Sequence, residues 1–262
     1  MTERIRQMTQ GAYAAVNGID LYYEIHGAEH PGPPLIMLHG GAYTFHLSFG
    51  AVLGSLSAER KVIGVELQGH GHTADSDRPF TIRQCAEDVI TLLDQLNIDQ
   101  ADFFGFSLGG LTATEVAVRA PERVRRLVLA ASHFGRTRSV AYYSEITDVQ
   151  LDSPRMPTEE QGAAMIRAYT EVAPNPDGFY EFVPKAQSEV HDFEGWSNEQ
   201  LARLTMPILI IIGDTDFVRL EHAVDMKQSV PNAQLAILPG TTHLEVIRPD
   251  LVLPMVSAFL AQ

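Results

Sequence analysis

Residues 103–110 read FFGFSLGG, a serine set between glycines directly after an apolar run. The run before the serine has the continuous apolar character of a strand buried on both faces, and a helix is predicted over 108–120. Gly105, Ser107 and Gly109 match the pattern G-x-S-x-G. A tight turn from strand to helix strains its central residue, and the glycines remove side chains that would clash there. The pattern therefore predicts that the Ser107 hydroxyl stands exposed above the edge of a sheet.

Strand patterns recur along the chain and alternate with helical ones. The apolar runs lie at 35–38, 61–67, 101–106, 124–131, 207–213 and 233–239. Helices are predicted over 81–97, where apolar residues recur every three to four positions, and over 249–261. The segment 12–25, with Asn17 and Gly18 in its middle, is typical of a hairpin with a primed turn. This alternation predicts an α/β fold with a doubly wound, mostly parallel sheet of about eight strands.

One long segment, 132–205, interrupts the alternation. It contains no strand-like run, but it has helical pieces separated by prolines and is rich in aromatic residues. A structureless loop of this length would be unusual in a compact domain. We therefore expect a helical cap over one end of the sheet, inserted into a core formed by 1–131 and 206–262.

The composition favours a soluble enzyme. Among 262 residues, 19 Lys and Arg stand against 33 Asp and Glu, which gives a net charge of −14. Such a charge repels nucleic acid and anionic membrane surfaces, so neither is expected as a partner. The single cysteine, Cys85, excludes an internal disulfide and lies on the apolar stripe of a predicted helix. With no apolar run long enough to span a bilayer and no secretory pattern, we expect a cytoplasmic protein.

From about residue 12 to its C-terminus, the chain resembles the α/β-hydrolase fold family. Besides the serine turn, four pieces follow predicted strands in the family's order. They are HGG at 39–41, QGHGH at 68–72, GDTD at 213–216 and GTTH at 240–243. The resemblance implies a catalytic triad of Ser107, Asp216 and His243. It also implies an oxyanion hole formed by the backbone N–H groups of Gly41 and Leu108.

The chemistry of the residues agrees with these roles. A neutral imidazole can take the proton of Ser107 near pH 7, and a carboxylate can orient it and stabilise the imidazolium. Two aspartates, Asp214 and Asp216, follow the strand run at 207–213. The family usually places its acid at the fourth position of such a turn, which favours Asp216, while Asp214 would cap the turn.

A partial metal-binding pattern lies at 70–75. His70, His72 and Asp75 partly match the zinc pattern H-x-H-x-D-H, but Asp75 comes one residue too late and no histidine follows it. We therefore expect a structural turn there, no metal site and no cofactor. Tyr43, His133 and Trp196 are predicted to bind substrate in a mainly apolar pocket.

Three classes of function fit these residues. The first is a serine hydrolase that cleaves a small carboxylic ester or lactone through an acyl-enzyme. The second uses the same triad for C–C bond hydrolysis of a dienoic keto acid, acyl transfer or perhydrolysis. The C–C hydrolase stays open because Arg136, Arg138, Arg155 and Arg167 lie in or near the predicted cap. The third is a binding protein with a silent triad, which the complete triad disfavours. The expected partner is a small acyl compound, and the sequence does not predict an oligomeric state.

Overall fold

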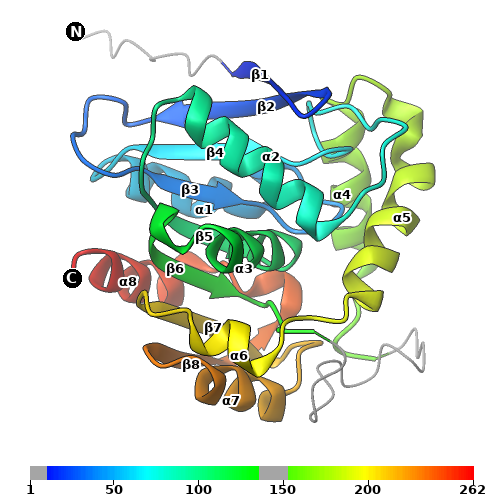
Figure 1. Cartoon of the computed structure of the whole chain (residues 1–262). Coiled ribbons are helices and arrows are strands. Elements are labelled where there is room, and N and C mark those ends of the chain that lie inside the picture. The colour runs from blue at the N-terminus through cyan, green and yellow to red at the C-terminus, as the bar shows by residue number, and fades with distance from the viewer. Residues whose placement is uncertain (1–10, 136–152) are drawn as a thin grey trace, which may run out of the picture.

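The computed structural model describes residues 11–135 and 153–262, which form one twisted sheet with helices on both faces (Figure 1). The strands of this sheet are β1 (Ala12–Val16), β2 (Ile19–His26), β3 (Leu35–Leu38), β4 (Val62–Glu66), β5 (Ala101–Phe106), β6 (Val124–Ala130), β7 (Ile208–Thr215) and β8 (Ala233–Thr242). Their spatial order is β1-β2-β4-β3-β5-β6-β7-β8. The pairs β1–β2 and β2–β4 are antiparallel, and the pairs from β4 to β8 are parallel. The predicted fold class is confirmed.

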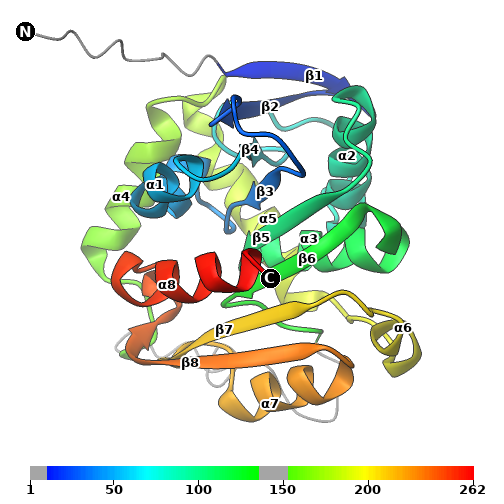
Figure 2. The same ribbon diagram turned by 90° about the vertical axis from the view of Figure 1, so that its left-hand side faces the viewer.

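Helices bury the two faces of this sheet in two separate cores. The helices are α1 (Phe45–Ser57), α2 (Ile82–Gln95), α3 (Leu108–Arg119), α4 (Glu159–Thr170), α5 (Phe179–Asp192), α6 (Asn198–Ala202), α7 (Leu220–Ser229) and α8 (Pro249–Leu260). One core contains residues of α2, α3, α6 and α7, and the other contains residues of α1 and α8 (Figures 1 and 2). Successive strand residues alternate between the two cores, as the period of a strand requires. Ile36 and Leu38 face the first core, whereas Leu35 and Met37 face the second.

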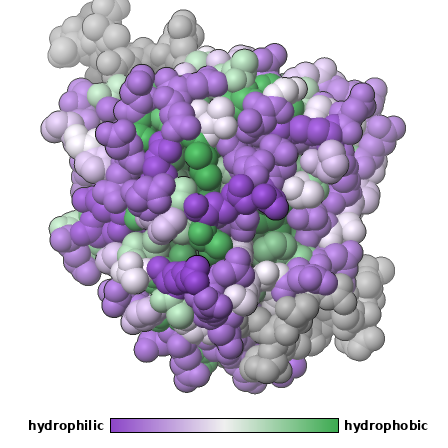
Figure 3. Space-filling view, viewed as in Figure 1, coloured by the Kyte–Doolittle hydropathy of each residue, from purple (hydrophilic) through white to green (hydrophobic). Residues whose placement is uncertain are grey.

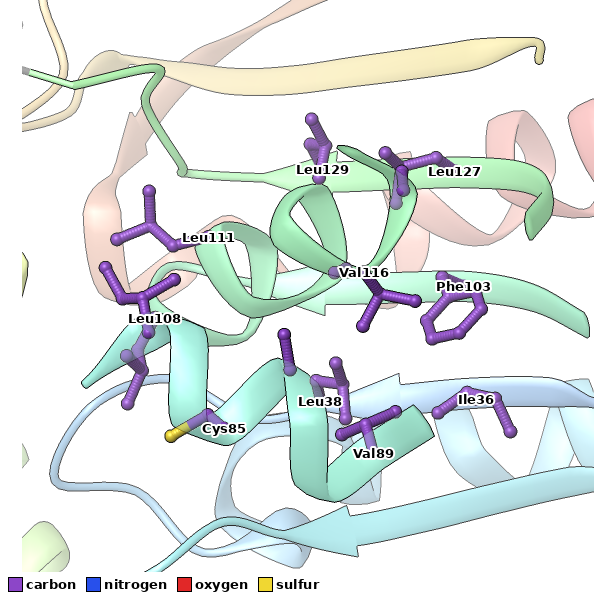
Figure 4. Packing of buried hydrophobic residues seen from close by; sticks show 14 of the residues in the cluster. Ile36, Leu38, Cys85, Val89, Phe103, Leu108, Leu111, Val116, Leu127 and Leu129 are labelled. Carbon is purple, nitrogen blue, oxygen red and sulfur yellow. The ribbon is translucent and has the colours of Figure 1, made fainter. Parts of the chain in front are cut away.

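The close-up of the first core shows Cys85 of α2 among apolar side chains of β3, β5 and α3 (Figure 4). The thiol is buried, and this burial raises its pKa far above the ordinary value. A thiol that stays protonated is a poor nucleophile. The prediction that Cys85 is a core residue is confirmed.

The amino-terminal hairpin forms as predicted. Asn17 and Gly18 connect β1 to β2 with φ angles of 44° and 89°. Positive φ at both central residues is the mark of the type I′ turn, for which Asn-Gly is the preferred pair.

Some element boundaries and two helices were not predicted. β7 continues past Gly213 to Thr215, and β8 continues to Thr242, because these two strands remain paired beyond the apolar runs. α1 contains Gly50 and Gly54, which lower helix propensity, and its helical pattern is correspondingly weak. The tertiary environment stabilises α1 instead, since it packs Phe49 and Val52 into the second core. α7 also lay outside the predicted elements.

α4 and α5 lie across the end of the sheet at which the parallel strands have their carboxyl ends (Figures 1 and 2). Pro184 lies inside α5 rather than ending it. α6 packs against α7, and both helices contribute residues to the first core. The division into a cap at 132–205 and a core stays a prediction, and 136–152 lie outside the described residues.

The surface agrees with the acidic composition. The face seen in Figure 3 is mostly hydrophilic, with hydrophobic residues in small separate areas. Within the described ranges, no helix is both long enough and apolar enough to span a bilayer.

Candidate active site

The turn from β5 to α3 holds Ser107 in an unusual backbone conformation, with φ 50° and ψ −114°. Non-glycine residues rarely adopt positive φ, and such strain clusters at functional sites. The flanking glycines are required by close contacts: a Cβ on Gly105 would lie 2.4 Å from the carbonyl oxygen of Gly109, and one on Gly109 would lie 1.9 Å from that of Leu38. Two side-chain-free positions therefore let β5 and α3 meet at a sharp turn that presents the Ser107 hydroxyl.

His243 lies between this serine and a carboxylate. Its Nε2 is 3.0 Å from Oγ of Ser107, and its Nδ1 is 2.7 Å from Oδ1 of Asp216. The two side chains come from loops that follow β7 and β8, and both are buried. Phe217 stacks on the imidazole, with ring centroids 4.8 Å apart. The imidazole therefore lies between the serine hydroxyl and the aspartate carboxylate. In this arrangement a histidine can take the proton of the hydroxyl while the carboxylate fixes the tautomer of the histidine.

Asp214 and Asp216 have different partners. The carboxylate of Asp214 accepts hydrogen bonds from the backbone N–H groups of Gly240 (2.9 Å) and Thr241 (3.1 Å). These bonds lower the pKa of Asp214, although the side chain is exposed. Asp216 instead contacts His243 and accepts the N–H of Val218 at 3.0 Å. Asp214 therefore holds the end of β8, and Asp216 is the aspartate whose carboxylate contacts His243.

Beside Ser107 lie two backbone N–H groups that donate no hydrogen bond to the described residues. In the loop after β3, the N–H of Gly40 donates to Oγ of Ser48 (3.3 Å) and that of Ala42 to Nε2 of His70 (3.1 Å). The N–H groups of Gly41 and Leu108 have no hydrogen-bond acceptor within the part of the chain that the structure describes. A Cβ on Gly41 would lie 3.9 Å from Cβ of Leu108, so the two residues are neighbours. Paired free donors of this kind suit a developing oxyanion.

Comparison with known proteins agrees with this geometry. The family model of the alpha/beta hydrolase fold matches residues 33–247. The chain belongs to the α/β-hydrolase fold family. It is 30% identical over 254 residues to a 2-hydroxymuconate semialdehyde hydrolase from Pseudomonas putida, with 88% of each chain covered. It is 24% identical to Esterase YbfF from Escherichia coli, over 88% of this chain and 94% of that one.

Solved structures show the same fold. The enol-lactonase from Burkholderia xenovorans LB400 superimposes with a TM-score of 0.75 and 23% identity, covering 95% of this chain and all of that one. A serine hydrolase involved in carbazole degradation superimposes with a TM-score of 0.78 and 21% identity, covering 97% and 99%. The four proteins named here are a semialdehyde hydrolase, an esterase, an enol-lactonase and a serine hydrolase, so their names differ in the substrate or bond that they specify.

Histidines and a glutamate support the loops of the site in this α/β-hydrolase. Nε2 of His39 accepts the N–H of Leu67 at 3.0 Å, while its Nδ1 lies 2.8 Å from the carbonyl oxygen of Gly40. Nδ1 of His70 lies 3.0 Å from the carbonyl oxygen of Gln68, and the Nε2 of this histidine accepts from Ala42. Burial lowers the pKa of both imidazoles. His70 thus links the 68–72 turn to the loop that contains Gly41.

The neighbouring histidine of the HxH pattern has a different partner. Nδ1 of His72 lies 2.8 Å from Oε2 of Glu66, and its own backbone N–H donates to the same oxygen. Oε1 of Glu66 accepts the N–H of Phe45 at the start of α1. The pattern at 70–72 is therefore a structural turn that joins β4 to α1. Among the described residues, no three His, Cys, Asp or Glu side chains are grouped to hold a metal ion.

A cavity of about 520 Å³ opens above Ser107 and His243. Its mainly apolar wall is formed by residues of the β3–α1 loop, β5, the segment before α4, α4 and α5, and by residues that follow β7 and β8. The apolar side chains of this wall are Ala42, Phe106, Met156, Pro157, Met165, Pro184, Ala186, Val190, Phe217 and Leu244. Tyr43, predicted to bind substrate, lines the cavity, and burial raises its pKa to about 12. The sequence did not indicate Met156, Met165 or Val190, since helical spacing does not tell which face of α4 or α5 turns toward the sheet.

The other two residues predicted to bind substrate, His133 and Trp196, do not line this cavity. Trp196 is buried between Phe134 and Phe193, and its Nε1 donates to Oε2 of Glu115 on α3 at 2.6 Å. This hydrogen bond connects the segment after α5 to α3, the helix that follows Ser107. A buried indole N–H needs such a partner, which directs the ring away from the cavity.

His133 follows β6 and is also buried. Its Nδ1 accepts the N–H of Gly135 at 3.1 Å, and its imidazole interacts with the backbone of Val190 near the end of α5. Burial and the nearby His222 hold the pKa of His133 well below its usual range. His133 therefore contacts the end of α5 and does not line the cavity.

The cavity wall predicts how acyl-chain length is selected. We expect Met165→Phe to lower kcat/KM for a p-nitrophenyl octanoate about tenfold relative to the acetate, because a bulkier wall excludes a few methylenes. The ratio of the two specificity constants is the measurement. Met255→Phe on α8, half-buried and outside the cavity lining, is the matched control and should leave that ratio unchanged. Equal losses for both esters would show that Met165 is a packing residue only.

Proposed function

We propose that the chain is a serine hydrolase that cleaves a small carboxylic ester or lactone through an acyl-enzyme intermediate. The observation that carries the proposal is the continuous contact from Oγ of Ser107 through His243 to Asp216. Oγ attacks the acyl carbon while Nε2 of His243 takes its proton, and the negative charge passes to the former carbonyl oxygen. The N–H groups of Gly41 and Leu108 stabilise that oxygen.

The second half of the reaction uses the same groups. His243 gives its proton to the leaving alcohol oxygen as the C–O bond breaks, which leaves an ester on Ser107. Water then attacks this ester while His243 takes a proton from the water, and His243 returns that proton to Oγ of Ser107 as the bond to the acyl carbon breaks and the acid product departs. Asp216 keeps Nδ1 of the imidazole protonated and stabilises the imidazolium in both halves.

The cavity lining favours an ester or lactone over a dienoic keto acid. The substrate of the C–C reaction carries a carboxylate, which an arginine or lysine would hold. No arginine or lysine is among the described residues that line the cavity. Arg155 donates from Nε to the backbone oxygen of Asp216, and Arg167 is exposed on α4. Arg136 and Arg138 lie outside the described residues.

C–C bond hydrolysis is the second candidate, because the P. putida relative with 30% identity is named a 2-hydroxymuconate semialdehyde hydrolase. Purified protein assayed in parallel on p-nitrophenyl esters, an uncharged lactone and a dienoic keto acid separates the two. We expect kcat/KM to be highest for an ester or lactone. The opposite ranking, with Ser107 required for the keto acid, would replace the first proposal by the second.

We expect activity to be independent of metal ions. Ser107, His243 and the two backbone donors together provide a nucleophile, a base and stabilisation of the oxyanion, so the proposed reaction needs no Lewis acid. Exhaustive treatment with EDTA followed by an ester assay measures this, with a metal-dependent phosphatase treated alongside to show that chelation is complete. Activity that is lost to EDTA and restored by zinc would contradict the proposal.

A further inference from the structure

Gly41, which supplies one of the two free N–H groups beside Ser107, lies between two peptide groups that other residues hold. Glycine restricts its own backbone less than any other residue, so the direction of its N–H depends on these neighbouring groups. In the preceding peptide, the carbonyl oxygen of Gly40 lies 2.8 Å from Nδ1 of His39 and accepts the N–H of Tyr43 at 3.2 Å. Because a trans peptide is planar, the N–H of Gly41 points away from that carbonyl. The preceding peptide is therefore fixed through its oxygen.

The peptide that follows Gly41 is held through its N–H group instead. This N–H belongs to Ala42 and donates to Nε2 of His70 at 3.1 Å; within the described ranges it has no second acceptor. Ala42 has a φ of 62°, a conformation that is strained for a residue with a side chain and that persists only where the surroundings impose it. The bond to His70 therefore opposes a relaxation of Ala42 that would turn the peptide next to Gly41.

The imidazole of His70 is a fixed and neutral acceptor. Its Nδ1 lies 3.0 Å from the carbonyl oxygen of Gln68, which can only accept, so the proton is on Nδ1 and the lone pair is on Nε2. Burial holds the pKa of this imidazole well below its usual range. The ring is packed between aromatic neighbours, with its centroid 4.9 Å from that of Phe182 and 4.7 Å from that of His39. The acceptor for Ala42 is thus held in one place and one protonation state.

We propose that His70 is a positioning residue of the reaction, which holds Ala42 so that the N–H of the adjacent Gly41 stays directed at the developing oxyanion. His70 does not line the cavity, so it acts through the loop and not on the substrate. A displaced donor matters only once charge develops on the carbonyl oxygen, so its loss lowers kcat and leaves KM unchanged. This inference rests on the proposed attack by Ser107.

The first measurement is steady-state kinetics on a p-nitrophenyl ester with three variants of His70. His70→Phe keeps an aromatic ring among the aromatic neighbours but removes the acceptor. We expect kcat to fall about 100-fold and KM to change less than about twofold, because the loss or misplacement of an oxyanion donor costs about this much. His70→Gln carries an amide oxygen that can accept the N–H of Ala42, and it should recover about tenfold of the loss. His70→Leu, which also lacks an acceptor, replaces His70→Phe if that protein does not fold.

The second measurement separates positioning from packing with two ketones of one carbon skeleton. Oγ of Ser107 adds to the carbonyl carbon of a trifluoromethyl ketone while His243 takes the proton, which leaves an alkoxide in the oxyanion hole. The matching methyl ketone stays trigonal and carries no such charge. In His70→Phe we expect Ki for the trifluoromethyl ketone to rise about 100-fold, in step with the loss of kcat, and Ki for the methyl ketone to stay at the wild-type value.

Thr73→Val is the matched control, because Thr73 directly follows the 68–72 turn and is buried as His70 is. Its hydroxyl accepts the N–H of Tyr22 at 2.9 Å and donates to the backbone oxygen of Glu66 at 2.6 Å. The variant therefore also loses two buried hydrogen bonds, but neither of them involves Ala42. We expect a lower unfolding temperature with wild-type values of kcat and of both Ki.

The outcomes distinguish this inference from the proposed function. Wild-type kcat in His70→Phe, an equal weakening of the two ketones, or no recovery in His70→Gln would overturn the positioning role while hydrolysis by Ser107 stands. A wild-type protein that cleaves no ester or lactone and binds both ketones equally would overturn the proposed function and the inference with it.

Discussion

Ser107→Ala is expected to lower kcat for a p-nitrophenyl ester by about 10⁶, the size of the loss when the serine of a triad is removed from another hydrolase. Only the attacking oxygen is removed, because alanine keeps the Cβ and the same backbone strain at φ 50°. The hydroxyl contacts His243 and fills no packed core position. We therefore expect the far-UV circular dichroism and the unfolding temperature to stay at the wild-type values.

Chemical labelling gives an independent measurement. A fluorophosphonate should modify Ser107 in the wild-type protein and nothing in the variant, as read by mass spectrometry. Ser132→Ala is the matched control, since Ser132 follows the neighbouring strand β6 and its buried hydroxyl makes no hydrogen bond to the described residues. Wild-type turnover by Ser107→Ala, or labelling of another residue, would remove Ser107 as the nucleophile.

Asp216→Asn is expected to lower kcat by about 10⁴, because an asparagine in this place stabilises the wrong tautomer of the triad histidine. Asp214→Asn should lower kcat less than about tenfold, since Asp214 contacts the backbone of Gly240 and Thr241 and not His243. The two variants make the same chemical change two residues apart, so each is the control for the other. Steady-state kinetics on one ester measures both.

Asp214→Asn should act on stability instead, with a defined pH dependence. The pKa of Asp214 is lowered in the folded protein, first by the N–H of Gly240 and then by that of Thr241. A lowered folded-state pKa contributes stability above the unfolded-state value of about 3.9, and this contribution is lost as the pH falls through the folded-state pKa. The unfolding temperatures of wild type and Asp214→Asn should therefore differ at pH 7 and converge in strong acid. For the kinetic prediction, a large loss of kcat in Asp214→Asn with little loss in Asp216→Asn would assign the acid of the triad to Asp214 instead.

The local sequence was sufficient for the serine turn and for the sheet. A Cβ at Gly109 or Gly105 would lie only 1.9 or 2.4 Å from a backbone oxygen, so neither position has room for a side chain. The glycines at 105 and 109 therefore indicate the sharp turn directly. Strands buried on both faces must be apolar throughout, which made most of the parallel strands visible as short runs. Ser107, Asp216 and His243 each come directly after a strand, namely β5, β7 and β8, and the sequence showed this order along the chain.

The tertiary structure alone decided which side chains line the cavity above Ser107. Trp196 contacts Glu115 across 81 positions of sequence, and no local pattern carries that pairing. α5 is buried on more than one side, with Phe182 in the sheet core and Val190 at the cavity, so its periodicity could not identify the face toward Ser107. α1, weak in local propensity because of its glycines, is stabilised by the second core. Sequence determined the serine turn because the contacts that constrain it lie between elements that follow each other in the chain, whereas the cavity wall depends on the packing of distant elements.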